Sequence, residues 1–108
     1  MTRPKIDPPQ GGEWIEMDDM NNVKVPDNPI VGFIDGDGVG PDIWAAARPV
    51  FDASVQKAYG SDRKIIWWKL SAGERCFHDT GESLSDETLE AITRAKVVIK
   101  GPLTTPVG

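Results

Sequence analysis

Two turns in this sequence carry side chains whose types and spacing could do chemistry. The first is Lys100-Gly-Pro-Leu-Thr-Thr-Pro-Val-Gly108, which follows an apolar run at 97–99. Threonine hydroxyls can donate hydrogen bonds to phosphate or ribose oxygens without adding charge, and a lysine offers a compact cation to an anionic substrate. Pro102 and Pro106 restrict the turn, which lowers the entropy lost on binding. A threonine pair in a turn is also a common local backbone cap, so these residues alone leave both interpretations open.

The second turn is the glycine-rich stretch Asp35-Gly-Asp-Gly-Val-Gly40, which lies between an apolar run and Pro41. A strand, a glycine loop and a helix in this order are typical of dinucleotide binding, but the third glycine comes one residue early for that fingerprint. The acidic side chains of the loop would also repel a pyrophosphate at the helix N-terminus. A calcium loop is excluded because its twelfth position would be Ala46, where a bidentate glutamate is needed. The pattern therefore predicts a structural loop, in which glycines permit the tight turn and the acids cap amides of their own loop and helix.

Cys76 is the only cysteine, and His78 lies two residues beyond it. A disulfide framework within the chain is impossible, and a single cysteine fits a reducing, cytoplasmic setting. A Cys–His nucleophile is the alternative to a half-buried structural thiol. Residues two apart in a strand or turn point apart or stay solvated, which favours the structural thiol.

Short apolar runs predict three strands at 30–34, 65–70 and 97–99. Alternation at 13–17 and 23–25 predicts a short β-hairpin before them. Strands that alternate with helices imply a parallel sheet with right-handed crossovers. The sequence therefore predicts an α/β fold, a parallel β-α-β-α-β unit preceded by a hairpin, after an extended or disordered leader rich in proline and glycine at 1–12. Open sheet edges and exposed tryptophans at 67 and 68 predict poor solubility for these residues alone.

The first predicted helix begins at Pro41 and ends near Gly60, with Pro49 kinking it near Ala45. The second begins after Ser85 as its cap, with Leu84 and Leu89 as a hydrophobic staple. Residues 71–81 between them are predicted to form an irregular loop. Leu89 and Ile92 are expected to face inward on the second helix. On the first helix the expected buried face consists of Ile43, Ala47, Val50, Ser54, Val55 and Ala58.

Composition excludes several classes of function. The chain has 108 residues, 39% hydrophobic and 27% charged, with a net charge of −5 and a pI near 4.7. An acidic chain without a basic stripe argues against nucleic-acid binding. No apolar stretch reaches the roughly 18 residues of a membrane span, and no cationic amphipathic helix is visible. The composition is that of a globular domain that partners neither nucleic acid nor membrane.

The run Ile34-Asp-Gly-Asp-Gly-Val-Gly-Pro-Asp42 resembles the strand-to-helix signature of the β-decarboxylating dehydrogenases, which include isocitrate, isopropylmalate and homoisocitrate dehydrogenases. Within that family, the segment 100–108 resembles the one carried by bacterial-type NADP-dependent isocitrate dehydrogenases. The likeness extends from about Val25 to Gly108. It implies that residues 13–108 form the N-terminal part of an isopropylmalate-dehydrogenase-like large α/β domain.

The resemblance also assigns roles. It implies that Thr104 contacts the nicotinamide end of NADP, that Leu103 and Thr105 line the same pocket, and that Lys100 lies near the substrate carboxylates. It implies oxidative decarboxylation of isocitrate to 2-oxoglutarate and CO₂ in the tricarboxylic acid cycle, with Mg²⁺ or Mn²⁺, by a cytoplasmic homodimer. None of the catalytic residues or metal ligands of the family is expected within these 108 residues.

The sequence is therefore interpreted as an N-terminal fragment of such an enzyme, inactive alone. Two alternatives stay open. One is another β-decarboxylating dehydrogenase, acting on isopropylmalate or homoisocitrate. The other is a truncated gene product without activity.

Overall fold

A three-stranded parallel sheet forms the centre of the molecule in the computed structural model, which describes residues 6–104 apart from the side chains at 74, 75 and 79. The central strand is β3 (Ile30–Ile34), flanked by β4 (Ile66–Lys69) and β5 (Val98–Lys100) in the order β4-β3-β5. All five residues of β3 are buried, as expected for an apolar strand covered on both faces. The predicted parallel β-α-β-α-β arrangement is confirmed, with β5 beginning one residue later than predicted.

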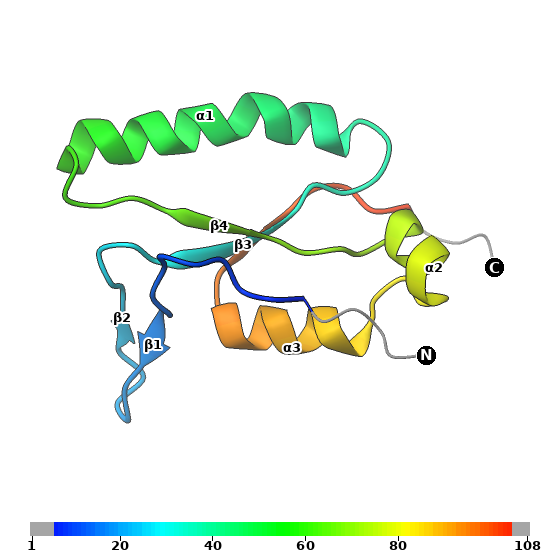
Figure 1. The fold of residues 1–108 in the computed structure, drawn as a ribbon, viewed down its shortest axis with the longest axis horizontal. Helices are drawn as coiled ribbons and strands as arrows, with labels where there is room; N and C mark the ends of the chain where they lie inside the picture. Colours follow the sequence, from blue (N-terminus) through cyan, green and yellow to red (C-terminus); the bar gives the residue numbers. More distant parts are fainter. Residues whose placement is uncertain (1–5, 105–108) are drawn as a thin grey trace.

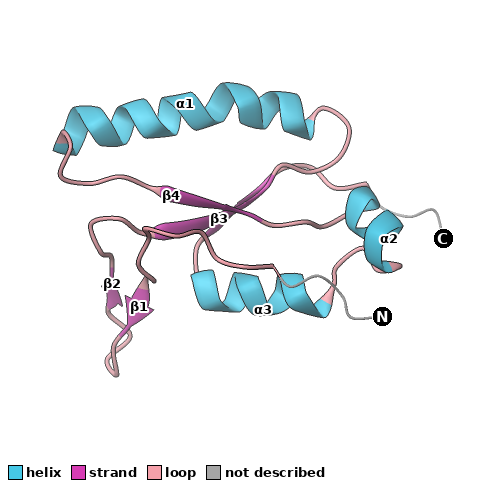
Figure 2. Cartoon of the chain, viewed as in Figure 1, coloured by secondary structure: helices cyan, strands magenta, loops and turns pink. Residues whose placement is uncertain are grey.

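Two helices cover opposite faces of this sheet (Figure 1). Helix α1 (Gly40–Tyr59) lies over one face and α3 (Asp86–Ala95) over the other, and the colouring by secondary structure shows the three layers (Figure 2). Each layer interface has its own apolar cluster. Trp67 belongs to the cluster beneath α1 and Trp68 to the cluster beneath α3, with 9% and 6% of their surfaces exposed. The expectation that these tryptophans are exposed is therefore wrong, because neighbouring strand residues point to opposite faces and each face carries a helix.

Helix α1 is helical through Pro49, and its orientation differs from the prediction. Ala47 and Val55 are half-buried, as predicted. The remaining members of the predicted inner face are exposed, namely Ile43, Val50, Ser54 and Ala58.

Aromatic packing explains this orientation. Trp44 stacks on Phe33 of the sheet with ring centroids 4.7 Å apart and meets Trp67 edge-on at 4.9 Å. Phe51 packs edge-on against Trp67 at 5.8 Å. Large rings bury more apolar surface than the aliphatic residues on the neighbouring stripe. The helix is therefore oriented with Trp44 and Phe51 toward the sheet.

The segment predicted as a loop contains a short helix, α2 (Glu74–Thr80), so that prediction is wrong. Gly73 and Gly81 have φ of +83° and +81° and delimit it. Cys76 is 2% exposed within α2, and the Thr80 hydroxyl donates to the Cys76 carbonyl oxygen at 2.8 Å. A seven-residue helix is too short for its helical repeat to be recognised in the sequence, because each turn contributes only about one residue to the buried face.

Helix α3 begins at the predicted cap. Ser85 Oγ accepts a hydrogen bond from the Thr88 backbone N–H at 3.3 Å. Leu84 and Leu89, the two residues of the predicted staple, are 44% and 45% exposed, so the prediction that Leu89 faces inward is wrong. Thr88 faces inward instead, and its hydroxyl donates to the Ser71 carbonyl oxygen at 2.7 Å. This polar anchor turns the face of Thr88, Ala91 and Ala95 toward the sheet, with Ile92 half-buried beside it.

The predicted hairpin is confirmed as β1 (Glu16–Met17) paired antiparallel with β2 (Val23–Lys24), and it projects from the body of the molecule (Figure 1). Arg94 of α3 holds its base, donating from Nη2 to Glu16 Oε1 at 2.9 Å. The same guanidinium lies 4.2 Å from the centre of the Trp14 ring. The hydrogen bond from Arg94 lowers the pKa of Glu16.

Candidate functional site at the carboxyl edge of the sheet

The carboxyl ends of the three parallel strands meet at one edge of the sheet. The glycine loop 35–40 follows β3, residues 70–73 follow β4, and residues 101–104 follow β5. In open parallel sheets, ligands bind in the crevice outside these ends. Backbone hydrogen bonds tie two of the three segments together, from Gly101 N–H to Ile34 O and from Asp37 N–H to Pro102 O, both at 2.7 Å.

Asp37 adds a side-chain bond to this junction. Its Oδ2 accepts a hydrogen bond from the backbone N–H of Thr104 at 2.7 Å. The N-cap residue of α1 is Val39, whose side chain makes no capping hydrogen bond, so the loop acids do not occupy the predicted capping position. The Asp37 carboxylate, predicted to bind amides of its own loop, thus accepts a hydrogen bond from the turn after β5.

Two glycines make this close approach possible. A Cβ on Gly36, whose φ is +88°, would lie 2.3 Å from the Pro102 carbonyl oxygen. A Cβ on Gly73 would lie 2.6 Å from Asp37 Oδ2 and 2.9 Å from Leu103 Cδ2. Both positions have a backbone φ that favours glycine. At Gly36 the obstacle to a side chain is backbone, whereas at Gly73 the ends of the Asp37 and Leu103 side chains would have to shift.

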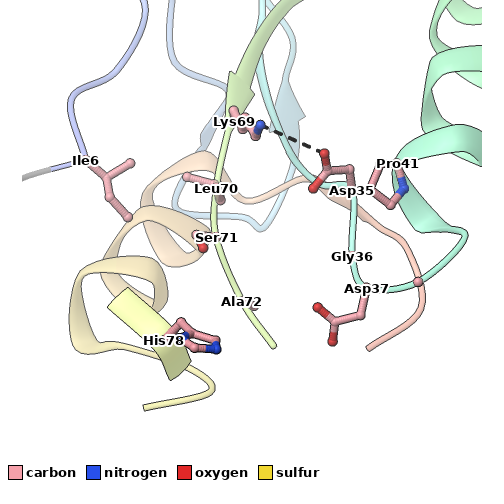
Figure 3. Close-up of a pocket in the computed structure, with 11 residues that line it drawn as sticks. Ile6, Asp35, Gly36, Asp37, Pro41, Lys69, Leu70, Ser71, Ala72 and His78 are labelled. Carbon is pink, nitrogen blue, oxygen red and sulfur yellow. Dashed lines mark ion pairs between the residues drawn. The ribbon is translucent and has the colours of Figure 1, made fainter. Parts of the chain in front are cut away.

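A cavity of about 750 Å³ opens at this edge (Figure 3). Its polar lining comes from the glycine loop, from the end of β4 and the segment after it, and from α2. Lys69 Nζ and Asp35 Oδ2 face each other at 3.9 Å across the ends of β4 and β3. The charged and polar lining residues are Asp35, Asp37, Lys69, Ser71 and His78.

The structure places three of the predicted site residues at the same edge. Thr104 is exposed and is held through its backbone N–H. Leu103 is half-buried against the apolar cluster beneath α3. Lys100 is exposed, and its Nζ donates to the Gly101 carbonyl oxygen at 3.0 Å. Thr105 lies outside the described residues.

Sequence reasoning missed the contributions of Gly73, Lys69 and His78 to this edge. The signal that could have found them is the parallel order of the strands, since it brings the residues that follow each strand together. Within residues 6–104, no group of three or more His, Cys, Asp or Glu side chains is arranged to hold a metal ion. No helix in this part of the chain is long and apolar enough to cross a membrane.

The fold defines an α/β protein whose candidate site lies at the carboxyl ends of a parallel sheet. The family model described as isocitrate/isopropylmalate dehydrogenase matches residues 30–108. The chain belongs to this family.

Several relatives within the family are NADP isocitrate dehydrogenases. The chain is 50% identical over 88 residues to that of Staphylococcus epidermidis, covering 82% of this chain and 21% of the relative. It is 46% identical over 107 residues to that of Caldococcus noboribetus, covering 99% of this chain and 25% of the relative. The crystal structure of isocitrate dehydrogenase from Methylococcus capsulatus superposes with a TM-score of 0.63 at 38% identity, over 74% of this chain and 22% of that one. The chain thus spans about a fifth to a quarter of the length of these proteins.

Proposed function

We propose that this chain forms the N-terminal part of the large α/β domain of an NADP-dependent isocitrate dehydrogenase. The proposed enzyme is a cytoplasmic homodimer that converts isocitrate to 2-oxoglutarate and CO₂. The observation that carries the proposal is the turn at Lys100–Thr104, which lies at the carboxyl edge of the sheet in a chain about half identical to NADP isocitrate dehydrogenases. These 108 residues are proposed to supply cofactor contacts and no catalysis of their own.

The turn after β5 has the chemistry that a nicotinamide dinucleotide needs. Thr104 is exposed at the edge, and its backbone N–H is already satisfied by Asp37. Its hydroxyl can therefore serve a ligand as donor or acceptor. Together with Leu103 and Thr105, this residue is proposed to hold the nicotinamide end of NADP.

Lys100 is proposed to lie near the carboxylates of isocitrate. Its side chain is exposed, and its present partner is the neighbouring carbonyl oxygen of Gly101. A carboxylate is a stronger partner for an ammonium group than a carbonyl oxygen, because both members of the pair are charged. Lys100 would thus exchange a local bond for a substrate contact.

Bound NADP would supply hydride acceptance from the hydroxyl carbon of the substrate, and a divalent Mg²⁺ or Mn²⁺ held by residues outside those described would supply Lewis-acid chemistry. No metal-ligating cluster exists among the described side chains. The proposed role of this chain is consequently limited to binding and orienting the cofactor and the substrate.

A graft tests the proposal. In the NADP isocitrate dehydrogenase of Caldococcus noboribetus, the 107 matched residues would be replaced by those of this chain. We expect the graft enzyme to oxidise isocitrate with NADP, and Thr104→Val in the graft to raise the KM for NADP by about tenfold, the effect of losing one hydrogen bond to a charged ligand.

The graft enzyme also distinguishes the proposed function from its two alternatives, another dehydrogenase of the family and a gene product without activity. Reduction of NADP with isopropylmalate but not isocitrate would show that this segment belongs to a different member of the family. A folded graft that oxidises neither substrate would refute the proposal. The isolated 108-residue chain, assayed beside it, is expected to show no turnover.

A further inference from the structure

Asp37 occupies a position where an acid looks unfavourable for a protein that binds a phosphate-bearing cofactor. It lies in the glycine loop, between a buried strand and a helix N-terminus, where an anion would otherwise be attracted. Its carboxylate, however, accepts the Thr104 N–H at 2.7 Å, while its own N–H donates to the Pro102 carbonyl oxygen at 2.7 Å. Asp37 therefore makes two hydrogen bonds to the turn after β5.

We infer that Asp37 is a positioning residue, which holds the turn 101–104 against the glycine loop so that Thr104 presents its hydroxyl at the carboxyl edge. This inference rests on the proposed function, because that function assigns the cofactor contact to Thr104. Asp37 acts through the backbone of the turn and does not itself contact the cofactor.

The segment after β4 completes the arrangement. Gly73 lies against both the Asp37 carboxylate and the Leu103 side chain, so any side chain at 73 would push one of them away. The Gly73 N–H donates to the Ser83 carbonyl oxygen at 2.6 Å, which fixes this segment from the far side. The Asp37 carboxylate thus lies between Gly73 and the Thr104 N–H, to which it is hydrogen-bonded.

The charge of the Asp37 carboxylate determines which substitutions at position 37 test the inference. A hydrogen bond to an ionised acceptor is about twice as strong as a neutral one. Asp37→Asn keeps the shape and an oxygen acceptor but loses the charge, whereas Asp37→Ala removes the acceptor. Asp42→Asn is the matched control, because Asp42 is an exposed acid in the first turn of α1 with no hydrogen bond or ion pair to the described residues.

The first readout is the solvent exchange rate of individual backbone amides in the 108-residue chain, measured by NMR. We expect the Thr104 amide to exchange about fivefold faster in Asp37→Ala, with Asp37→Asn intermediate and Asp42→Asn unchanged. The Gly101 amide, which donates to Ile34 O rather than to Asp37, is the internal reference and should keep its rate. Equal changes at both amides, or none at Thr104, would overturn the inference.

The second readout is the pair of KM values in the graft enzyme. Asp37→Ala is expected to raise the KM for NADP about fivefold and to change the KM for isocitrate and kcat by less than twofold, with partial rescue in Asp37→Asn. Faster Thr104 exchange with an unchanged KM for NADP would overturn the positioning role. An inactive graft carrying the unsubstituted chain would instead refute the proposed function, and the exchange rates would still decide whether Asp37 holds the turn.

Discussion

Replacing Gly36 with alanine is expected to break the junction between the glycine loop and the turn after β5. Gly36 has φ of +88°, where an alanine costs about 1–2 kcal/mol. The added Cβ would lie 2.3 Å from the Pro102 carbonyl oxygen, which must move and so gives up its bond from the Asp37 N–H. That bond contributes about 1 kcal/mol net. The free energy of unfolding should therefore fall by about 2–3 kcal/mol.

Gly38→Ala is the matched control for this substitution. Gly38 lies two residues further along the same loop with φ of +58°, and a Cβ there meets no atom within 4 Å. Gly38→Ala carries the same conformational cost, about 1–2 kcal/mol, without the collision. The difference between the two variants therefore measures the contact between the two segments alone.

Urea unfolding followed by tryptophan fluorescence provides the assay. Trp67 and Trp68 lie in separate apolar clusters, one on each face of the sheet, so their emission reports on both layers. A domain of about 100 residues loses about 4–8 °C of Tm per kcal/mol, so in a parallel thermal melt Gly36→Ala should unfold about 8–24 °C below the unsubstituted chain. Equal destabilisation by Gly36→Ala and Gly38→Ala would refute the reasoning, because it would mean that the Pro102 carbonyl oxygen does not constrain position 36.

Two further predictions concern bonds that join α1 and α3 to the rest of the molecule. Asp52 Oδ1 accepts the Trp67 indole N–H at 2.9 Å, so Asp52→Ala leaves a buried donor without its partner and should cost about 1–2 kcal/mol. In the Trp67→Phe background the same change should cost under about 0.5 kcal/mol, and equal costs in the two urea series would contradict this prediction. Glu16, whose pKa is lowered from 4.5 by its hydrogen bond from Arg94, should contribute stability that is complete above pH 4.5 and lost as the pH falls through the lowered value. Glu16→Gln should therefore lose less stability between pH 6 and pH 3 than the unsubstituted chain, and identical pH profiles from thermal melts would show that the bond does not form.

Elements specified by local sequence could be predicted. The five apolar residues of β3 were delimited correctly, since an uninterrupted apolar run between prolines and glycines suits a strand covered on both faces. The Ser85 cap was also predictable, because the acceptor and the donor are three residues apart.

Errors arose where tertiary packing chooses between local alternatives. Helix α1 has apolar residues on two stripes, and only the rings of Phe33 and Trp67 on the sheet make the Trp44 stripe the inner one. In α3 the Ser71 carbonyl oxygen draws Thr88 inward and leaves Leu89 outside. Hydropathy alone ranks these residues in the opposite order.

The candidate site could be predicted only in part. The resemblance to the family supplied its threonine turn, whereas the meeting of the three strand ends at one edge was not predicted. The bond between Asp37 and Thr104 joins residues far apart in the sequence, and nothing near either residue indicates it. Gly73 gave no signal either, since its constraint comes from side chains of two other segments.

The position of β3 at the centre of the sheet has a consequence for synthesis of the chain. Both of its hydrogen-bonding partners, β4 and β5, come later in the sequence. At roughly 5–20 residues per second on the ribosome, Val98 follows Ile34 by about 3–13 s. Throughout that interval at least one edge of an entirely apolar strand is unpaired, which is the feature that holdase chaperones recognise and that nucleates aggregation. Residues 30–34 therefore keep an unpaired strand edge until β5 has been synthesised.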